Sequence, residues 1–409
     1  MARLAFLGAL AALVCAFQAG AAAPAREVWI GAWGASPTPV NLVATARNRV
    51  SASFNNQTLR QVVRLSAGGT KVRIRLSNEY GAAPLRIGAA HVALAGEGGA
   101  VQPGSDHVLT FGGDPAAVIP PGAPLLSDPV DMKLAALSSL AVSLYLPGET
   151  GPCTCHPVGV QTGYASGPGD FTAAPAFPAN QTFLYRAYLS GVEVVPERPG
   201  GAVVVLGDSI SDGTASTPDS NQRWPDRLAE RLAARDGGRR AWGVIDEGIS
   251  GNRLLAPGAG ESALARFDRD VLGAAGARYL VVFLGVNDLG LGLGPNAPPV
   301  KLTPAELIAG YRQLIARAHA HGLKIYGATI TPYEGAAYWS PEGDAARRAI
   351  NSWIRTSGAY DAVIDFDAVW RDPARLSQIK PGLGAPDHLH GSDLGYRALG
   401  DAVNLELFR

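Results

Sequence analysis

The chain has 409 residues, and its 35 Lys+Arg balance its 35 Asp+Glu, so the formal net charge is zero. At about 100–200 residues per domain, this length predicts two domains. Zero net charge with only 17% charged residues argues against a nucleic-acid-binding protein, which needs a basic face. The hydrophobic fraction of 47% excludes a chain that is disordered throughout, and the 3 cysteines exclude a disulfide-dense scaffold.

Residues 1–23 have the pattern of a secretory signal peptide. Met1-Ala2-Arg3 provides a positive start, Leu4 to Phe17 is apolar, and the small residues from Ala19 to Ala23 offer a cleavage site. The apolar run is too short to span a bilayer comfortably, which argues against the alternative of a membrane anchor. We therefore expect a secreted or periplasmic protein with no stable membrane insertion.

Residues 27–195 have the pattern of a β-rich domain. Polar and apolar residues alternate over residues 60–65 and 71–76, and Ser66-Ala67-Gly68-Gly69 between them predicts a hairpin turn. Further strands are expected over residues 85–95, 140–146 and 183–195. Because no helical periodicity competes, a β-sandwich or jelly-roll-like domain is the economical interpretation.

Two cysteines within this region, Cys153 and Cys155, lie in the segment P-C-T-C-H-P. In an exported protein they can be oxidised, although a bridge closing so small a loop would be strained. They can equally be two free thiols. A metal site with His156 is the third alternative, but no second cluster completes four ligands, and we expect no metal.

Residues 196–201 contain two prolines, two glycines and two charged residues, which indicates a linker. From residue 202 to residue 409 the pattern changes to apolar strands that alternate with helices, which predicts a parallel sheet with helices on both faces. Strands are expected over 203–206, 244–245, 280–284, 324–330 and 362–366. Helices are expected over 224–235, 344–356 and 392–405, and from the capping box of Thr303 and Glu306 to His321.

Reactive residues follow these strands, where α/β sheets hold their chemistry. Ser209 lies in G-D-S-I-S directly after the first strand, G-I-S-G-N at 248–252 follows the second, and G-V-N-D at 285–288 follows the third. D-H-L-H at 387–390 precedes the last helix. An Asn amide can donate to an oxyanion, and an Asp three residues before a His can orient its imidazole. Neither the G-x-S-x-G nucleophile elbow nor a phosphate-loop lysine motif occurs.

These four blocks, in this order, resemble those of the SGNH hydrolases, also called GDSL esterases and lipases. The resemblance covers about residues 202–409 and implies a flavodoxin-like three-layer α/β fold. By this resemblance Ser209 is the nucleophile, His390 its base and Asp387 the orienter of His390. The implied oxyanion donors are the N–H groups of Ser209 and Gly251 and the side chain of Asn287.

The reaction implied is ester hydrolysis through an acyl-enzyme on Ser209, which needs no metal or organic cofactor. We interpret His388 as structural because its spacing from Asp387 does not fit the block. Asp208 and Asp288 are interpreted as hydrogen bonders that shape their loops. His156 is expected to have a local structural role, with the rim of the active site as the alternative.

The sequence indicates the substrate less clearly than the reaction. Tyr333, Tyr338, Trp339 and Trp370 lie on loops after later strands, where they can bind a sugar ring or an acyl group, or simply pack. The Leu/Gly repeat over residues 289–294 is apolar and flexible enough to admit an acyl chain or form a lid. We expect a small-molecule or polysaccharide ester as partner, with acetyl groups of a glycan favoured. The alternatives are a lipase or lysophospholipase, an acyltransferase with the same triad, and a non-catalytic binding protein.

Overall fold

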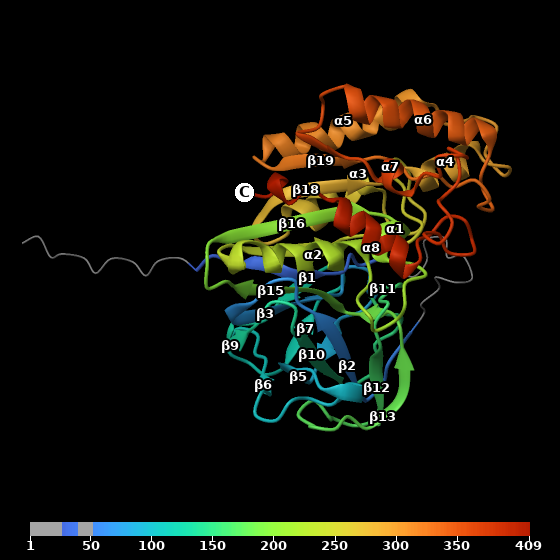
Figure 1. Ribbon diagram of the computed structural model, residues 1–409. Coiled ribbons are helices and arrows are strands. Elements are labelled where there is room, and N and C mark those ends of the chain that lie inside the picture. The colour runs from blue at the N-terminus through green and yellow to red at the C-terminus, as the bar shows by residue number, and fades with distance from the viewer. Residues whose placement is uncertain (1–26, 40–51) are drawn as a thin grey trace, which may run out of the picture.

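The computed structural model describes residues 27–39 and 52–409, and the predicted signal peptide lies outside them. Figure 1 shows two parts, which we call the β-rich region (residues 27–195) and the α/β region (residues 200–409). Only residues 196–199 separate the last strand of the first from the first strand of the second, so this connection is shorter than the predicted linker. Within the described residues, no helix is both long and apolar enough to cross a membrane.

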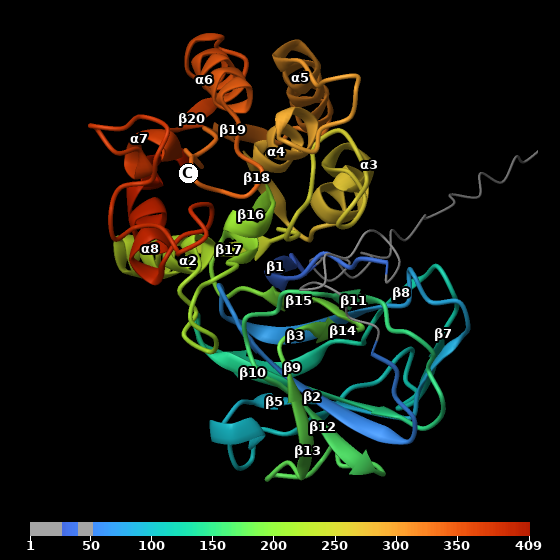
Figure 2. The same cartoon turned by 90° about the vertical axis from the view of Figure 1, so that its right-hand side faces the viewer.

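The β-rich region contains two antiparallel sheets that enclose one apolar core (Figure 2). The first has the order β1 (Ile30–Gly34), β15 (Leu189–Val195), β3 (Gly69–Ser77) and β8 (Pro124–Leu126), with β9 (Val130–Leu134) also on β3. The second has the order β13 (Ala179–Phe183), β12 (Gly163–Pro168), β2 (Gln57–Arg64), β10 (Ser139–Leu146), β5 (Ala89–Leu94) and β6 (His107–Val108). Two small sheets pair β4 (Leu85–Ile87) with β7 (Ala117–Ile119), and β11 (Cys155–His156) with β14 (Arg186–Ala187); η1 is Glu97–Gly99.

The β-rich character agrees with the sequence, but the predicted hairpin at residues 66–69 is wrong. β2 pairs with β10 and β12, whereas β3 pairs with β15, β8 and β9 in the other sheet. Both strands alternate because both face the same core from opposite sides, and alternation does not encode the pairing partner. The segment that connects β2 and β3 bonds to β1 instead, since the Ser66 N–H donates to the Ala32 carbonyl at 2.8 Å. Jelly-roll connectivity stays a prediction.

Two predicted strands of this region are interrupted. The segment 85–95 divides into β4 and β5, and the segment 183–195 is broken around Tyr188, which has a φ of 61°. Cys153 and Cys155 form a disulfide, which excludes the free-thiol and metal alternatives for this pair.

The α/β region is built on a five-stranded parallel sheet in the order β17-β16-β18-β19-β20. This is the strand order of flavodoxin-like folds, in which the switch point lies between the first and third strands. The strands are β16 (Gly200–Gly207), β17 (Ala241–Asp246), β18 (Ala277–Phe283), β19 (Lys324–Ala328) and β20 (Ala362–Ile364). The apolar run of β16 is fully buried because helices cover both faces of the sheet.

Helices α2, α7 and α8 lie on one side of this sheet and α3, α4 and α5 on the other (Figure 2). The helices are α1 (Ser209–Asp212), α2 (Trp224–Ala234), α3 (Ala263–Phe267), α4 (Val286–Leu293), α5 (Pro304–Ala320), α6 (Pro341–Thr356), α7 (Phe366–Trp370) and α8 (Asp393–Ala402). Short turns of helix are η2 (Arg235–Gly238), η3 (Asp268–Leu272) and η4 (Leu405–Leu407). The capping box predicted at Thr303 and Glu306 begins α5.

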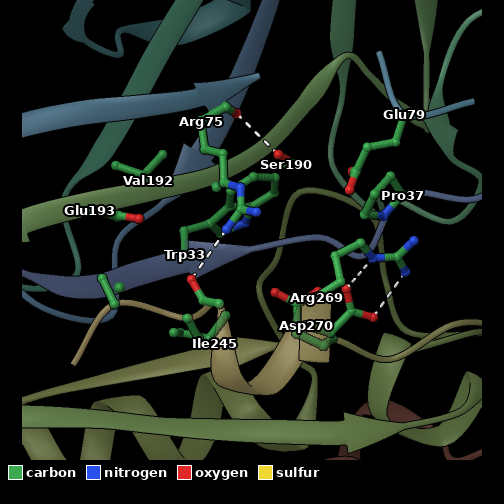
Figure 3. A pocket seen from close by; sticks show the side chains of 16 residues that line it. Trp33, Pro37, Arg75, Glu79, Ser190, Val192, Glu193, Ile245, Arg269 and Asp270 are labelled. Atoms are coloured by element: carbon green, nitrogen blue, oxygen red, sulfur yellow. Dashed lines mark hydrogen bonds and ion pairs between the residues drawn. The ribbon is translucent and has the colours of Figure 1, made fainter. Parts of the chain in front are cut away.

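The two regions meet along β1, which packs against the edge strand β17. Ser66 joins them, because its Oγ accepts the Val244 N–H at 2.8 Å and donates to the Ala32 carbonyl at 2.6 Å. A cavity of about 40 Å³ lies at this interface. Figure 3 shows its lining, in which Trp33 and Arg75 come from the β-rich region and Arg269 and Asp270 from the α/β region. The interface is therefore polar as well as apolar, and it lies directly behind the loops that follow β16 and β17.

Phe366 should be one of the most sensitive core positions of the α/β region. Its fully buried ring contacts Trp224 and Phe283, with ring centroids 5.2 and 5.0 Å apart. We expect Phe366→Ala to lower the free energy of unfolding by about 3–5 kcal/mol, because it removes buried surface and leaves a cavity. Phe366→Leu, which keeps most of the volume, should cost less than about 1.5 kcal/mol. Equal urea midpoints for the two variants would contradict this packing.

Candidate active site

Ser209 lies where the buried strand β16 ends and the short helix α1 begins. Asp208 is the N-cap of α1, and its carboxylate accepts the Ile210 N–H at 3.0 Å. This arrangement turns the chain sharply at the carboxyl edge of the sheet. The Ser209 side chain is therefore presented at that edge, although the residue as a whole is only 4% exposed.

His390 and Asp387 approach Ser209 from the loop that precedes α8. His390 Nε2 is 2.8 Å from Ser209 Oγ, and His390 Nδ1 is 2.6 Å from Asp387 Oδ2. The other carboxylate oxygen of Asp387 accepts the N–H groups of Leu389 and His390 at 3.1 and 3.0 Å. The structure thus brings together the three residues that the sequence had separated by 181 positions at the widest.

Asp387 is held in its ionised form. Partial burial would raise the pKa of its carboxyl, but the hydrogen bonds and charge of His390 outweigh burial and lower the pKa well below its usual range. An ionised Asp387 accepts from Nδ1–H of His390, so when the imidazole is neutral Nε2 is the unprotonated nitrogen and faces the Ser209 hydroxyl. The geometry is that of a nucleophile, a base and an orienting carboxylate.

The loop after β17 lies against α1 and carries Gly251. Gly251 has a φ of 83°, a left-handed conformation that favours glycine. At Gly248 a side chain would be excluded by contact, because a Cβ there would lie 2.6 Å from the backbone nitrogen of Asp212. No described residue accepts a hydrogen bond from the N–H of Ser209 or Gly251, so neither donor is satisfied within the described residues.

Asn287 stands at the start of α4, after β18. Its Nδ2 donates to the Asn252 carbonyl at 3.0 Å, and its Oδ1 accepts from the Tyr338 hydroxyl at 3.1 Å. These two partners fix which way the amide points, since a carbonyl can only accept and Oδ1 cannot donate. The second hydrogen of Nδ2 remains for a ligand.

Asp208 and Asp288 shape their loops, as interpreted from the sequence. Asp288 accepts the N–H groups of Leu254 and Leu255 at 2.8 and 3.1 Å and so ties α4 to the loop after β17. Burial raises the pKa of Asp208 to about 7 and that of Asp288 to about 6. Neither carboxylate contacts the Ser209 hydroxyl.

Arg266 of α3 is a residue of this site that sequence reasoning missed. It is fully buried, and its guanidinium donates to the carbonyls of Gly207 and Glu247 at 2.9 and 2.6 Å and to Asn252 Oδ1 at 3.1 Å. Asp270 neutralises it at 2.9 Å. Arg266 thereby joins the ends of β16 and β17, which carry two of the four blocks.

The aromatic residues predicted near the substrate are mostly enclosed. Tyr333 and Trp370 are fully buried, and the Trp370 indole donates to the Gly395 carbonyl at 2.9 Å. Trp339 is half-buried against the core, and Tyr338 contacts Asn287 as described. Of this set, Tyr338 is the aromatic residue that reaches the active-site amide.

His388 is exposed, with a φ of 58°, and its N–H donates to the Ala385 carbonyl at 3.1 Å. The structural role interpreted for the His388 side chain stays a prediction. The Leu/Gly repeat over 289–294 is mainly helix α4 rather than a flexible loop or lid, because Leu289 and Leu293, four residues apart, both enter the core. The described residues include no cluster of His, Cys, Asp and Glu side chains able to hold a metal ion.

Residues 205–398 match the model of the GDSL-like lipase/acylhydrolase family. These residues therefore form a GDSL-like lipase/acylhydrolase domain, as their resemblance to the SGNH hydrolases predicted. Among curated proteins, none matches the chain.

Three solved structures are similar to this chain, and their sequence identity, coverage and TM-score are as follows. A variant of an acetyl xylan esterase from Geobacillus stearothermophilus is 21% identical over 50% of this chain and 93% of that chain, with a TM-score of 0.39. A GDSL-like lipase from Bacteroides thetaiotaomicron is 18% identical over 49% and 85%, with a TM-score of 0.36. An alpha/beta hydrolase from the metagenome of Lake Arreo is 19% identical over 50% and 94%, with a TM-score of 0.39.

The lowered pKa of Asp387 should make the difference in stability between wild type and Asp387→Asn depend on pH. A carboxyl whose pKa is depressed by folding stabilises the fold above its unfolded value, near 4, and loses that contribution as the pH falls toward the folded value. Wild type should therefore melt at a higher temperature than Asp387→Asn at pH 7, and the difference should shrink as the pH falls from about 5 to about 2. Thermal melts of both proteins across this pH range test the prediction, and a difference in melting temperature that is independent of pH would contradict a lowered pKa of Asp387.

Proposed function

We propose that this protein is a serine esterase that hydrolyses carboxylic esters through an acyl-enzyme on Ser209. The observation that carries this proposal is the continuous contact from Asp387 through His390 to Ser209, with 2.6 and 2.8 Å between the joined atoms. The family of residues 205–398 supports the same class of reaction.

In the first half of the reaction, His390 Nε2 takes the proton of the Ser209 hydroxyl while Oγ attacks the ester carbonyl carbon. Asp387 stabilises the imidazolium that forms. His390 then gives the proton to the alcohol oxygen as the bond from carbonyl carbon to alcohol oxygen breaks. In the second half, water takes the place of the hydroxyl, and the acid leaves with Ser209 restored.

The negative charge on the carbonyl oxygen is stabilised by three donors. We assign them to the N–H groups of Ser209 and Gly251 and to Asn287 Nδ2. Two observations support this assignment: both N–H groups are open among the described residues, and the Asn287 amide is oriented by its two partners. Donors fixed before the reaction stabilise the developing charge without reorganisation.

We propose acetyl or similarly short acyl esters of a glycan as substrates. The segment that could have received a long acyl chain, residues 289–294, is largely helix α4, and its Leu289 and Leu293 are committed to the core. The site also lies at an open edge, since the Asp387 side chain is 41% exposed, which suits an ester carried on a polymer. Export, as predicted from residues 1–23, would bring the enzyme to such polymers.

Ser209→Ala should abolish cleavage of p-nitrophenyl acetate while the circular dichroism spectrum and melting temperature stay close to those of wild type. The variant removes the attacking oxygen and nothing that the fold needs. A fluorophosphonate probe should label wild type at this residue and leave the variant unlabelled. Turnover by Ser209→Ala at the wild-type rate would refute the nucleophile, and a wild type that never labels would favour a non-catalytic binding protein.

Asn287→Ala should lower kcat by about 10²–10³-fold, as expected for the loss of one oxyanion donor. KM should change much less, because the lost interaction strengthens only as charge develops. Asn404→Ala is a matched control, since its side chain caps η4 outside the site. A kcat for Asn287→Ala equal to that of the control would remove Asn287 from the oxyanion hole.

A substrate panel tests the acyl length and the carrier. We expect kcat/KM to fall steeply from acetyl to octanoyl p-nitrophenyl esters and acetate to be released from acetylated xylan or pectin. Preference for lysophospholipid or long acyl chains would replace the glycan proposal with a lipase-type activity. Transfer of acetyl to an added sugar in preference to water would identify an acyltransferase.

A further inference from the structure

Two segments of the β-rich region reach the back of the catalytic loops. One is the segment after β1 that contains Ser36 and Thr38, and the other is β11 with its disulfide-bonded Cys155 and His156. They are joined to each other, because the N–H and the hydroxyl of Thr38 both donate to the Cys155 carbonyl, at 2.8 and 3.0 Å. His156 is only 5% exposed, and its ring faces the α/β region.

The contacts of His156 establish its charge. Its Nδ1 is 2.9 Å from the Ser36 carbonyl, and its Nε2 is 3.0 Å from the Val158 carbonyl and 2.9 Å from Asp212 Oδ1. Carbonyl oxygens only accept hydrogen bonds, so both ring nitrogens must carry a hydrogen. The ring is therefore an imidazolium. Burial alone would lower the pKa of His156, but the charge of Asp212 and the hydrogen bonds to Asp212 and Ser36 outweigh burial and raise it.

Asp212 in turn contacts the loop after β17, residues 247–252, which we call the oxyanion loop. It is the last residue of α1, the helix that Ser209 begins. Its second oxygen, Oδ2, accepts the N–H of Ser250 at 2.9 Å and the Ser250 hydroxyl at 2.6 Å. Ser250 directly precedes Gly251. One carboxylate therefore sets the spacing between the helix of Ser209 and the N–H of Gly251.

We propose that His156 is a positioning residue for catalysis: its imidazolium, supplied by the β-rich region, holds Asp212 in the orientation that aligns the Gly251 donor with Ser209. This inference rests on the proposed function. Without the imidazolium, Asp212 is a buried carboxylate with no cation in contact, and it must recruit water or a proton, or turn away from Ser250. His156 lies behind the loops and does not touch substrate.

The principal test is His156→Ala, with Ser66→Ala as the matched control. Ser66 also makes a buried hydrogen bond across the interface of the two regions, to Val244, but contacts neither Asp212 nor Ser250. For His156→Ala we expect kcat for p-nitrophenyl acetate and the rate of fluorophosphonate labelling to fall by about 10-fold, a change of about 1.4 kcal/mol, with KM within about twofold of wild type. Ser66→Ala should lower the urea midpoint and leave kcat unchanged. A folded His156→Ala protein with wild-type kcat would overturn the proposal.

A double-mutant cycle shows whether His156 acts through Asp212. The fold-changes in kcat from His156→Ala and Asp212→Ala should not multiply, because either substitution breaks the same link. If the two fold-changes multiply, the proposed route is wrong. The double variant also covers the case in which a single variant fails to fold, since it buries neither charge alone. A folded double variant with wild-type kcat would likewise overturn the proposal.

Ser209→Ala, assayed on the same substrate, separates this inference from the proposed function. If Ser209→Ala retains activity, the proposed function fails and the positioning role fails with it. If Ser209→Ala is inactive while His156→Ala and the double variant turn over at the wild-type rate, only the positioning role fails.

Discussion

The candidate active site depends on one buried cation. Arg266 donates to the carbonyls at the ends of two parallel strands and to the Asn252 side chain, and among the described residues no other side chain bonds to all three. A fully buried guanidinium is stable only with a partner, which Asp270 provides. Asp270 in turn accepts from the Ser36 hydroxyl at 2.5 Å, so the neutralisation of Arg266 extends into the β-rich region.

A second buried pair, His156 with Asp212, supports the oxyanion loop in a similar way. In both pairs one charged side chain bonds to backbone or hydroxyl groups of the catalytic loops, and the β-rich region takes part in the pair. Its Ser36 donates to Asp270, the counterion of Arg266, and its His156 is the counterion of Asp212. Donors that must be fixed before a charge develops need such rigid support. The two pairs explain how short loops rich in glycine hold a defined geometry.

The residues at the strand ends were predictable because their chemistry is local. Ser209, Asn287 and Asp387 each lie in a short sequence block, and the neighbouring residues of that block indicate either the residue's chemical partner or the turn that presents it. Arg266 and Asp212 were not predictable in this way, because their partners are carbonyls and hydroxyls dispersed along the chain, and an Arg or Asp on a helix carries no sign of such a partner. The proximity of Asp212 to the nucleophile block was a signal that could have singled it out.

The fold shows the same division. The alternation of buried apolar strands and helices predicted the parallel sheet, since that pattern reports burial on both faces. In the β-rich region the alternation correctly located β2 and β3 but could not assign them to different sheets, because pairing depends on distant strands. The Leu/Gly repeat after Asn287 suggested flexibility, although the spacing of Leu289 and Leu293 was already that of a helix packed on one face.

The disposition of His156 also bears on how such proteins are assembled in evolution and in the laboratory. The α/β region is not freely interchangeable. Fused to an unrelated N-terminal domain, it would keep Asp212 at the end of α1 and lose His156, the cation that contacts it. Recombination between relatives would therefore succeed most readily where the crossover leaves His156 and Asp212 with the same parent.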